Sequence, residues 1–149
     1  MANDFYAQLD GIELLFRELY NMGVEGEKAS NKALKAGGKV FLKLMKQKVP
    51  YSDKRGNKHL RDALAVSGIK KDDTGNPYVS VGTYLGNGQY RNGVYWGHII
   101  NGGHVIKSSS NGKVIGYVAA RPFMQEAFEQ GQNEATQAVG KIVFEAMGL

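Results

Sequence analysis

The stretch EGEKASNKALKAGGKVFLKLMKQKVP, residues 25–50, predicts the longest helix of the chain and therefore the element on which the fold is built. We expect this helix over residues 27–48, because Pro50 disfavours helical geometry in the residue before it. The pair Gly37 and Gly38 costs about 1 kcal/mol per glycine relative to alanine, so another element is expected to pack closely there. At 100° per residue, one broad apolar face collects Ala29, Ala33, Ala36, Gly37, Val40, Phe41, Leu44 and Met45.

A narrow stripe of lysines runs beside that apolar face, with spacings of 4, 3, 4, 4 and 3 residues. Three interpretations are open: a solvated face, contact with acidic surfaces of neighbouring subunits, or contact with DNA phosphates. Because the chain has no helix-turn-helix signature and no aromatic platform, such lysines would bind phosphates without sequence preference. This lysine row consists of Lys28, Lys32, Lys35, Lys39, Lys43 and Lys46.

Charge is segregated along the 149 residues, although the net charge is only +5. Residues 28–61 carry nine Lys and two Arg against one Asp, which gives +10. Residues 1–27 carry six acids and one Arg, which gives −5, and residues 122–149 carry four Glu and one Lys, which gives −3. A chain with a basic middle and acidic ends can pair with itself, with its own copies or with a polyanion.

The composition, with 42% hydrophobic and 22% charged residues, fits one globular domain over residues 1–149. Twenty glycines indicate many turns. The absence of cysteine excludes disulfides, thiolate metal sites and a cysteine nucleophile. The N-terminus lacks the pattern of a signal peptide, and no apolar stretch has the length of a membrane span, so we expect a soluble protein made in a cytoplasm.

Shorter elements surround the long helix. Residues 10–23 predict a short helix with Asp10 as its N-cap, residues 4–9 could form a strand, and residues 123–147 predict a second long helix, weakened at Gly131. Four Asn-Gly pairs between residues 87 and 112 favour tight turns. Four segments rich in Val, Ile and Tyr predict strands: ALAVSGIKK (63–71), PYVSVGTYL (77–85), GVYWGHII (93–100) and KVIGYVA (113–119).

The order of these elements predicts an α+β fold. We expect an antiparallel sheet of about four strands packed against two long helices, with a short N-terminal helix. Residues 50–61 and 101–113 are expected to be flexible loops.

Several polar segments could suggest chemistry, and each has a simpler explanation. The segment GNGQYRNG, residues 86–93, lacks the Gly-Lys-Ser/Thr of a phosphate loop and lies between predicted strands. The serines at 108–110 have no nucleophile motif around them. Glu126 and Glu129 suit the positive N-terminal end of the last helix. We expect these segments to be turns and helix ends.

Histidine carries the remaining possibility of catalysis or metal binding. His59, His98 and His104 are too few for a zinc site without a carboxylate at ligand spacing. A small hydrolase that uses His98 or His104 is the weakest of the alternatives. We therefore expect no catalytic, cofactor-binding or metal-binding residues.

The segment YVAARPFMQEAFEQ, residues 117–130, joins the last predicted strand to the last helix. Pro122 forces Arg121 into an extended conformation and presets φ for the first helical turn, so that Phe123 can reach the core. Arg121 would cap carbonyls, pair with an acid inside the fold, or reach a neighbouring subunit. Trp96 is expected to anchor either the core or a subunit interface.

The order of features and several local matches resemble the Hong Kong 97-like tail-component family of tailed bacteriophages. The end of the Lys- and Ala-rich helix in KVP (48–50) resembles the family's Ala-Pro, and HLRDAL (59–64) resembles its Leu-Arg-x-Ser-Ile entry into the first strand. YWG (95–97) and ARPFM (120–124) resemble its aromatic-Gly strand and its Ala-Arg-Pro-Phe turn. The resemblance extends over residues 5–147, and Ala-Arg-Pro-Phe is its most specific part.

This resemblance implies a non-catalytic structural protein of a long-tailed phage, a tail-completion or neck component that forms a ring at the head–tail junction or upper tail. The implied partners are copies of the chain in a sixfold ring, other neck and tail proteins, and DNA passing through the lumen, with no membrane and no cofactor. The implied location is the virion tail or neck, after synthesis in the host bacterial cytoplasm. The alternative is a small non-specific nucleic-acid-binding protein that uses the lysine row.

Overall fold

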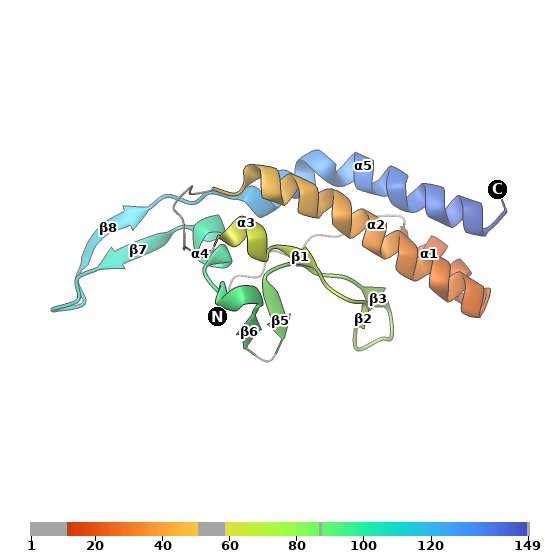
Figure 1. The fold of residues 1–149 in the computed structure, drawn as a ribbon, viewed down its shortest axis with the longest axis horizontal. Helices are drawn as coiled ribbons and strands as arrows, with labels where there is room; N and C mark the ends of the chain where they lie inside the picture. The colour runs from red at the N-terminus through yellow and green to blue at the C-terminus, as the bar shows by residue number, and fades with distance from the viewer. Residues whose placement is uncertain (1–11, 51–58, 87, 149) are drawn as a thin grey trace.

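Two long helices, α2 (Val24–Lys48) and α5 (Phe123–Ala146), lie side by side along the length of the molecule (Figure 1). The computed structural model describes residues 12–50, 59–86 and 88–148. The two helices run in opposite directions and share the largest contact in the fold. Helix α1 (Ile12–Asn21) packs against both of them at one end. The predicted strand at residues 4–9 and the predicted N-cap Asp10 lie outside the described residues.

Small residues allow α2 and α5 to approach closely. A β-carbon built at Gly37 would lie 3.0 Å from Cγ2 of Val139, and one at Gly131 would lie 2.5 Å from Cδ1 of Leu44. Helix α5 is continuous through Gly131, where weakening was expected, and Gly131 is a contact point between the helices. The buried positions of α5 form a single i, i+4 row of Phe123, Ala127, Gly131, Ala135, Val139 and Val143.

The ends of α2 follow from local backbone geometry. Gly23, with φ of 78°, separates α1 from α2, and this left-handed conformation favours glycine. At the other end Val49 is extended, with φ −68° and ψ 138°, as the following proline predicts. The close packing predicted at the glycine pair is also confirmed, because a β-carbon at Gly38 would lie 2.9 Å from Cγ1 of Val66.

The predicted four-stranded sheet is wrong in its details, although the α+β class is confirmed. The strands form four separate antiparallel pairs on one side of α2 and beyond its end (Figure 1). These pairs are β1 (Ala65–Val66) with β4 (Val81–Gly82), β2 (Lys70–Lys71) with β3 (Pro77–Tyr78), β5 (Tyr84–Gly86) with β6 (Gln89–Tyr90), and β7 (His104–Lys107) with β8 (Val114–Val118).

A serine side chain explains why two of the predicted strands are divided. Between β1 and β2, the hydroxyl of Ser67 donates to the carbonyl of Gly68 (2.8 Å) and accepts the backbone N–H of Ser80 (2.9 Å). Side-chain hydrogen bonds of this kind compete with the regular ladder. The first two predicted strands therefore break at this point into β1, β2, β3 and β4.

One further prediction of strand is wrong. The expected entry to the first strand, residues 59–64, contains helix α3 (Leu60–Ala63), which leads into β1. Residues 93–100, predicted as a strand, contain the end of a 3-10 turn, η1 (Arg91–Gly93), and the start of helix α4 (Gly97–Gly102). The turn uses positive φ at Asn92 (55°) and Gly93 (70°), which bends the chain away from a strand. Within the expected loop 101–113 lies β7, which pairs with β8 as a hairpin. Most of the other expected loop, residues 50–61, lies outside the described residues.

The core has two parts along the helix pair. One part lies where the end of α2, helix α3 and the start of α5 meet, and its largest fully buried side chain is that of Phe123. The second part joins α1 to the other end of the pair through Leu19, Ala33, Val139 and Val143. Neither part includes a side chain of β7 or β8.

Candidate functional site

The junction predicted at Arg121, Pro122 and Phe123 is tied to the end of α4. The backbone N–H of Arg121 donates to the carbonyl of Ile100 (2.9 Å). The buried Asn101 accepts the backbone N–H of Met124 through its Oδ1 (3.1 Å). Together these bonds fix the point at which α5 begins.

Pro122 and Arg121 differ somewhat from the sequence-based expectation. Pro122, with φ −76° and ψ 58°, is the N-cap and precedes the first helical residue instead of being it. The Arg121 side chain is exposed, and the described residues offer it no carboxylate partner. Its contact with a neighbouring subunit stays a prediction. Asn101 was missed by sequence reasoning because nothing local distinguishes it from the other Asn-Gly pairs.

Trp96 is half-buried and packs against the part of the core that contains Phe123. Its ring meets that of Tyr95 edge-on, with centroids 5.6 Å apart. The ring centroids of Tyr95 and Tyr90 lie 6.5 Å apart, and those of Tyr90 and Tyr84 lie 5.2 Å apart. A series of neighbouring rings therefore extends from the core to the surface. This aromatic series extends across η1 and was not visible as a sequence pattern.

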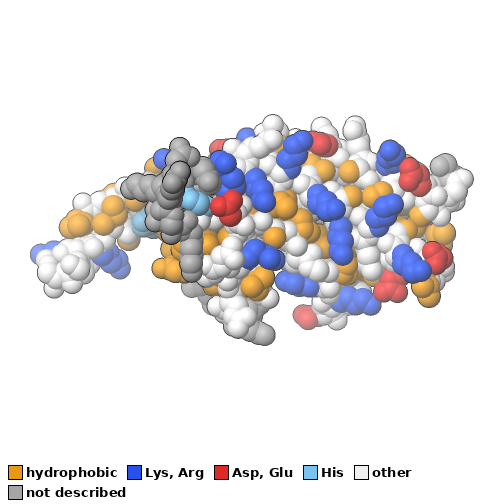
Figure 2. Space-filling model, viewed as in Figure 1, with side chains coloured by type: hydrophobic (Ala, Val, Ile, Leu, Met, Phe, Trp, Pro, Cys, Tyr) orange, Lys and Arg blue, Asp and Glu red, His pale blue; other side chains and the backbone are white. Residues whose placement is uncertain are grey.

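The lysine row lies on the solvent side of α2, where all its members are exposed except Lys46, which is half-buried. Figure 2 shows Lys and Arg side chains distributed over this face of the molecule. Lys28 pairs with Glu25 on the same helix (3.1 Å), an exposed pair of little energetic value. Near the end of α2, a shallow depression of about 670 Å³ is lined by Lys39, Leu42, Lys43, Lys46, Gln47 and Arg61.

The polar candidates for catalysis or metal binding are dispersed. His59 precedes α3, His104 is exposed on β7, and the described residues contain no group of three or more His, Asp or Glu that could hold a metal ion. Ser108 and Ser110 lie in the β7–β8 turn, with their hydroxyls 2.9 Å apart. Glu126 and Glu129 are exposed near the start of α5. None of the described helices is long and apolar enough to cross a membrane.

The β7–β8 hairpin projects past the ends of the long helices (Figure 1). No side chain of the two strands is buried. Several of these exposed side chains are large and apolar, and Tyr117 is 78% exposed. A lone two-stranded hairpin is marginally stable in water, so this surface is of the kind that a partner covers.

Comparison with known proteins gives one match. Residues 15–103 match the family model described as "Bacteriophage HK97-gp10, putative tail-component". The matched residues run from α1 to the residue after α4 and make up more than half of the chain. No curated protein and no solved structure matches the chain. The chain therefore belongs to the HK97-gp10-like family of bacteriophage tail components.

Proposed function

We propose that this protein is a tail-completion or neck component, which acts without catalysis by assembling into a ring at the head–tail junction or upper tail. The family match over residues 15–103 carries the proposal, because the family is described as a component of the phage tail. Segregated charge and exposed apolar side chains support an assembly role.

A ring needs two unlike surfaces on each subunit. When a patch on one copy meets a different patch on the next, the contacts close into a ring if the rotation allows it. Opposite charges on the two patches then fix the register of neighbouring subunits. We propose sixfold symmetry for this ring, with other neck and tail proteins stacked on its two faces.

The lysine row is proposed to face either an acidic surface in this assembly or the DNA in its lumen. Five of its six lysines are exposed, so they are available to a partner. Charge reversal at Lys35, Lys39 and Lys43 should impair tail assembly or DNA retention in the particle. A matched control is Lys141→Glu, which reverses an exposed lysine on α5 outside the row. Unchanged assembly and DNA content in the triple variant would assign the row to solvent.

Deletion of the gene from the phage that encodes the protein tests the proposed function. The expected lysate contains DNA-filled heads and unjoined or abnormal tails by electron microscopy, and the intact gene supplied in trans restores infectious particles. Normal infectious particles in the deletion lysate would refute the proposal.

A small non-specific nucleic-acid-binding protein is the second candidate, and the exposure of the lysine row favours it. Binding of this kind depends on phosphate neutralisation, so its affinity falls steeply with salt. Titration of the isolated protein with duplex DNA at several salt concentrations measures the slope. Absence of binding at low salt eliminates this candidate, whereas the tail role does not require any.

A further inference from the structure

Both faces of the β7–β8 hairpin carry apolar side chains. The register pairs Val105 with Tyr117 and Ile106 with Gly116, so these two pairs lie on opposite faces. Val118 lies on the face of Ile106. Ile115 lies where the register shifts, and its side chain is 68% exposed. A hairpin on a monomer's surface normally keeps one face polar. Here apolar side chains are exposed on both faces of the hairpin.

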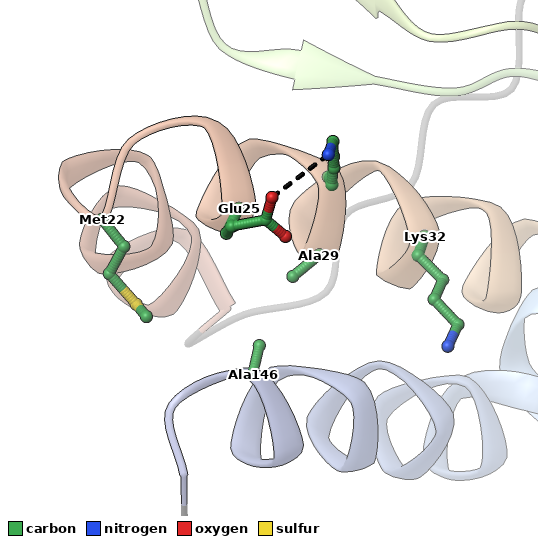
Figure 3. A pocket seen from close by; sticks show the side chains of 6 residues that line it. Met22, Glu25, Ala29, Lys32 and Ala146 are labelled. Carbon is green, nitrogen blue, oxygen red and sulfur yellow. Dashed lines mark hydrogen bonds and ion pairs between the residues drawn. The ribbon is translucent and has the colours of Figure 1, made fainter.

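A second exposed apolar surface lies at the opposite end of the molecule. It is formed by the α1–α2 turn and the end of α5, where Met22, Val24 and Phe144 are about half exposed or more. A shallow hollow of about 310 Å³ opens there, with Met22, Ala29 and Ala146 as its apolar lining (Figure 3). Glu25, Lys28 and Lys32 supply its polar lining. We call this region the helical end.

The two ends also differ in charge. No Asp or Glu occurs between Asp73 and Glu126, and the hairpin contributes Lys107 and Lys113 within that segment. The helical end has exposed carboxylates at Glu18, Glu25, Glu27 and Glu145, together with the exposed cations Arg17, Lys28 and Lys32, of which Lys28 pairs with Glu25. The hairpin is therefore purely basic, whereas the helical end offers carboxylates beside its exposed apolar side chains.

We propose that the β7–β8 hairpin of one copy docks on the helical end of the next copy, with Tyr117 filling the hollow beside Met22 and Ala146. This proposal rests on the proposed function, since it supplies the contact by which the ring would close. A tyrosine is well suited to such a role, because it buries a large rigid ring while its hydroxyl stays near water. Lys107 and Lys113 then lie against the carboxylates of the neighbouring helical end.

The hairpin and the helical end lie at opposite ends of the molecule, and this favours contact between them over contact of the hairpin with another exposed apolar surface. Because the ends lie far apart along the long axis (Figure 1), the hairpin of a copy cannot dock on the helical end of the same copy. Each hairpin therefore docks on the next copy, and the contact repeats from subunit to subunit. Hairpin-to-hairpin contact would oppose like charges. Contact with the exposed Tyr84, Leu85 and Tyr95 would place the hairpin on a segment without carboxylates.

Disulfide trapping tests the contact directly, because the chain has no cysteine of its own. Tails assembled with the double variant Tyr117→Cys/Met22→Cys are oxidised and analysed on non-reducing gels. The matched control is Tyr117→Cys/Leu85→Cys, since Leu85 is as exposed as Met22 (50% and 48%). We expect a ladder of linked copies for the first variant and at least a tenfold weaker one for the control. Equal ladders, or none from tails that contain the protein, would overturn the docking proposal.

Charge exchange gives an independent readout. The variant Lys107→Glu/Lys113→Glu should reduce infectious particles by roughly tenfold or more, because it opposes like charges at the contact. Adding Glu25→Lys/Glu27→Lys to the same chain should recover most of that loss. No recovery would contradict the proposed pairing. Wild-type phage tails that lack the unmodified protein altogether would instead refute the proposed function, so the two failures are distinguishable.

Discussion

The α2–α5 pair and the β7–β8 hairpin use their apolar residues in opposite ways. In the helix pair, Ala33, Ala135 and Val143 are completely buried, and glycines bring the backbones together. In the hairpin, large apolar side chains such as Ile115 and Tyr117 remain 68% and 78% exposed. The apolar residues of the helix pair are therefore buried within one chain, whereas those of the hairpin stay exposed within one chain, as the proposed docking requires. Variants in the two regions should separate folding from assembly.

The largest expected effect on folding is at Phe123, which is 1% exposed. Phe123→Ala should lower the free energy of unfolding by about 3–5 kcal/mol, since it removes a large side chain and leaves a cavity. Urea denaturation of the isolated protein followed by circular dichroism measures this loss. A change below 1 kcal/mol would mean that the junction with α5 is not part of the core.

A smaller loss is expected from Gly131→Val, which forces a side chain between α5 and Leu44. The expected cost is about 1–3 kcal/mol from overpacking. Gly140→Ala on the same helix is the matched control, because its β-carbon would meet only the Phe144 ring at 3.8 Å. The control should stabilise the protein by up to about 1 kcal/mol through helix propensity. Equal effects at both glycines would contradict the close approach of α2 and α5.

Substitutions in the hairpin should affect assembly of the phage and leave the folding stability of the isolated protein nearly unchanged. Ile115→Ser should change the free energy of unfolding of the isolated protein by no more than about 0.5 kcal/mol, because its side chain contacts mainly water. Its effect should appear in the phage, as a loss of infectious particles when the variant complements the deletion. A strongly destabilised isolated protein would show that the hairpin belongs to the fold of a single chain.

The smallest effect on stability is expected from pH at the β2–β3 turn, an exposed hairpin turn held by hydrogen bonds within the chain. The Asp72 carboxylate accepts hydrogen bonds from the Thr74 hydroxyl, the Asn76 backbone N–H and the Thr74 backbone N–H. These bonds lower the pKa of Asp72 below its usual 3.8. A lowered folded-state pKa stabilises the turn above the unfolded pKa, and this contribution disappears as pH falls through the folded value. An NMR titration should show the Asp72 carboxyl protonating below 3.8, and protonation above that value would contradict it.

The helices α1, α2 and α5 and the strand β8 were predictable from sequence, whereas α3, α4 and most of the short strands were not. The ends of α2 and α5 follow from Pro50, Pro122 and the apolar periodicity, which are local signals. The division of the strands depends on Ser67, whose hydroxyl accepts the backbone N–H of Ser80, a residue distant in the chain. The segment containing Trp96 is typical of a strand in composition, yet its backbone bends at Asn92 and Gly93, which have positive φ, and enters α4 at Gly97.

The candidate surfaces were predictable only in part. The lysine row followed from spacing alone, because exposed helix positions repeat with the helix period. The hairpin contact could not be foreseen, since exposure on both faces of β7 and β8 depends on where the fold places the hairpin. The motif ARPFM is the most specific part of the family resemblance, yet it lies beyond the matched residues 15–103. Its role is structural: Phe123 is buried in the core, and the Met124 backbone N–H donates to the side chain of Asn101.

Hydrogen exchange tests the central distinction most directly, by comparing the isolated protein with assembled tails that contain it. Amides of α2 and α5 should exchange slowly in both samples, because their protection comes from packing within one chain. Amides of β7 and β8 should exchange rapidly in the isolated protein and become strongly protected in the tails. Equal exchange of the hairpin in the two samples would contradict the account that it is an assembly surface covered by a neighbouring copy.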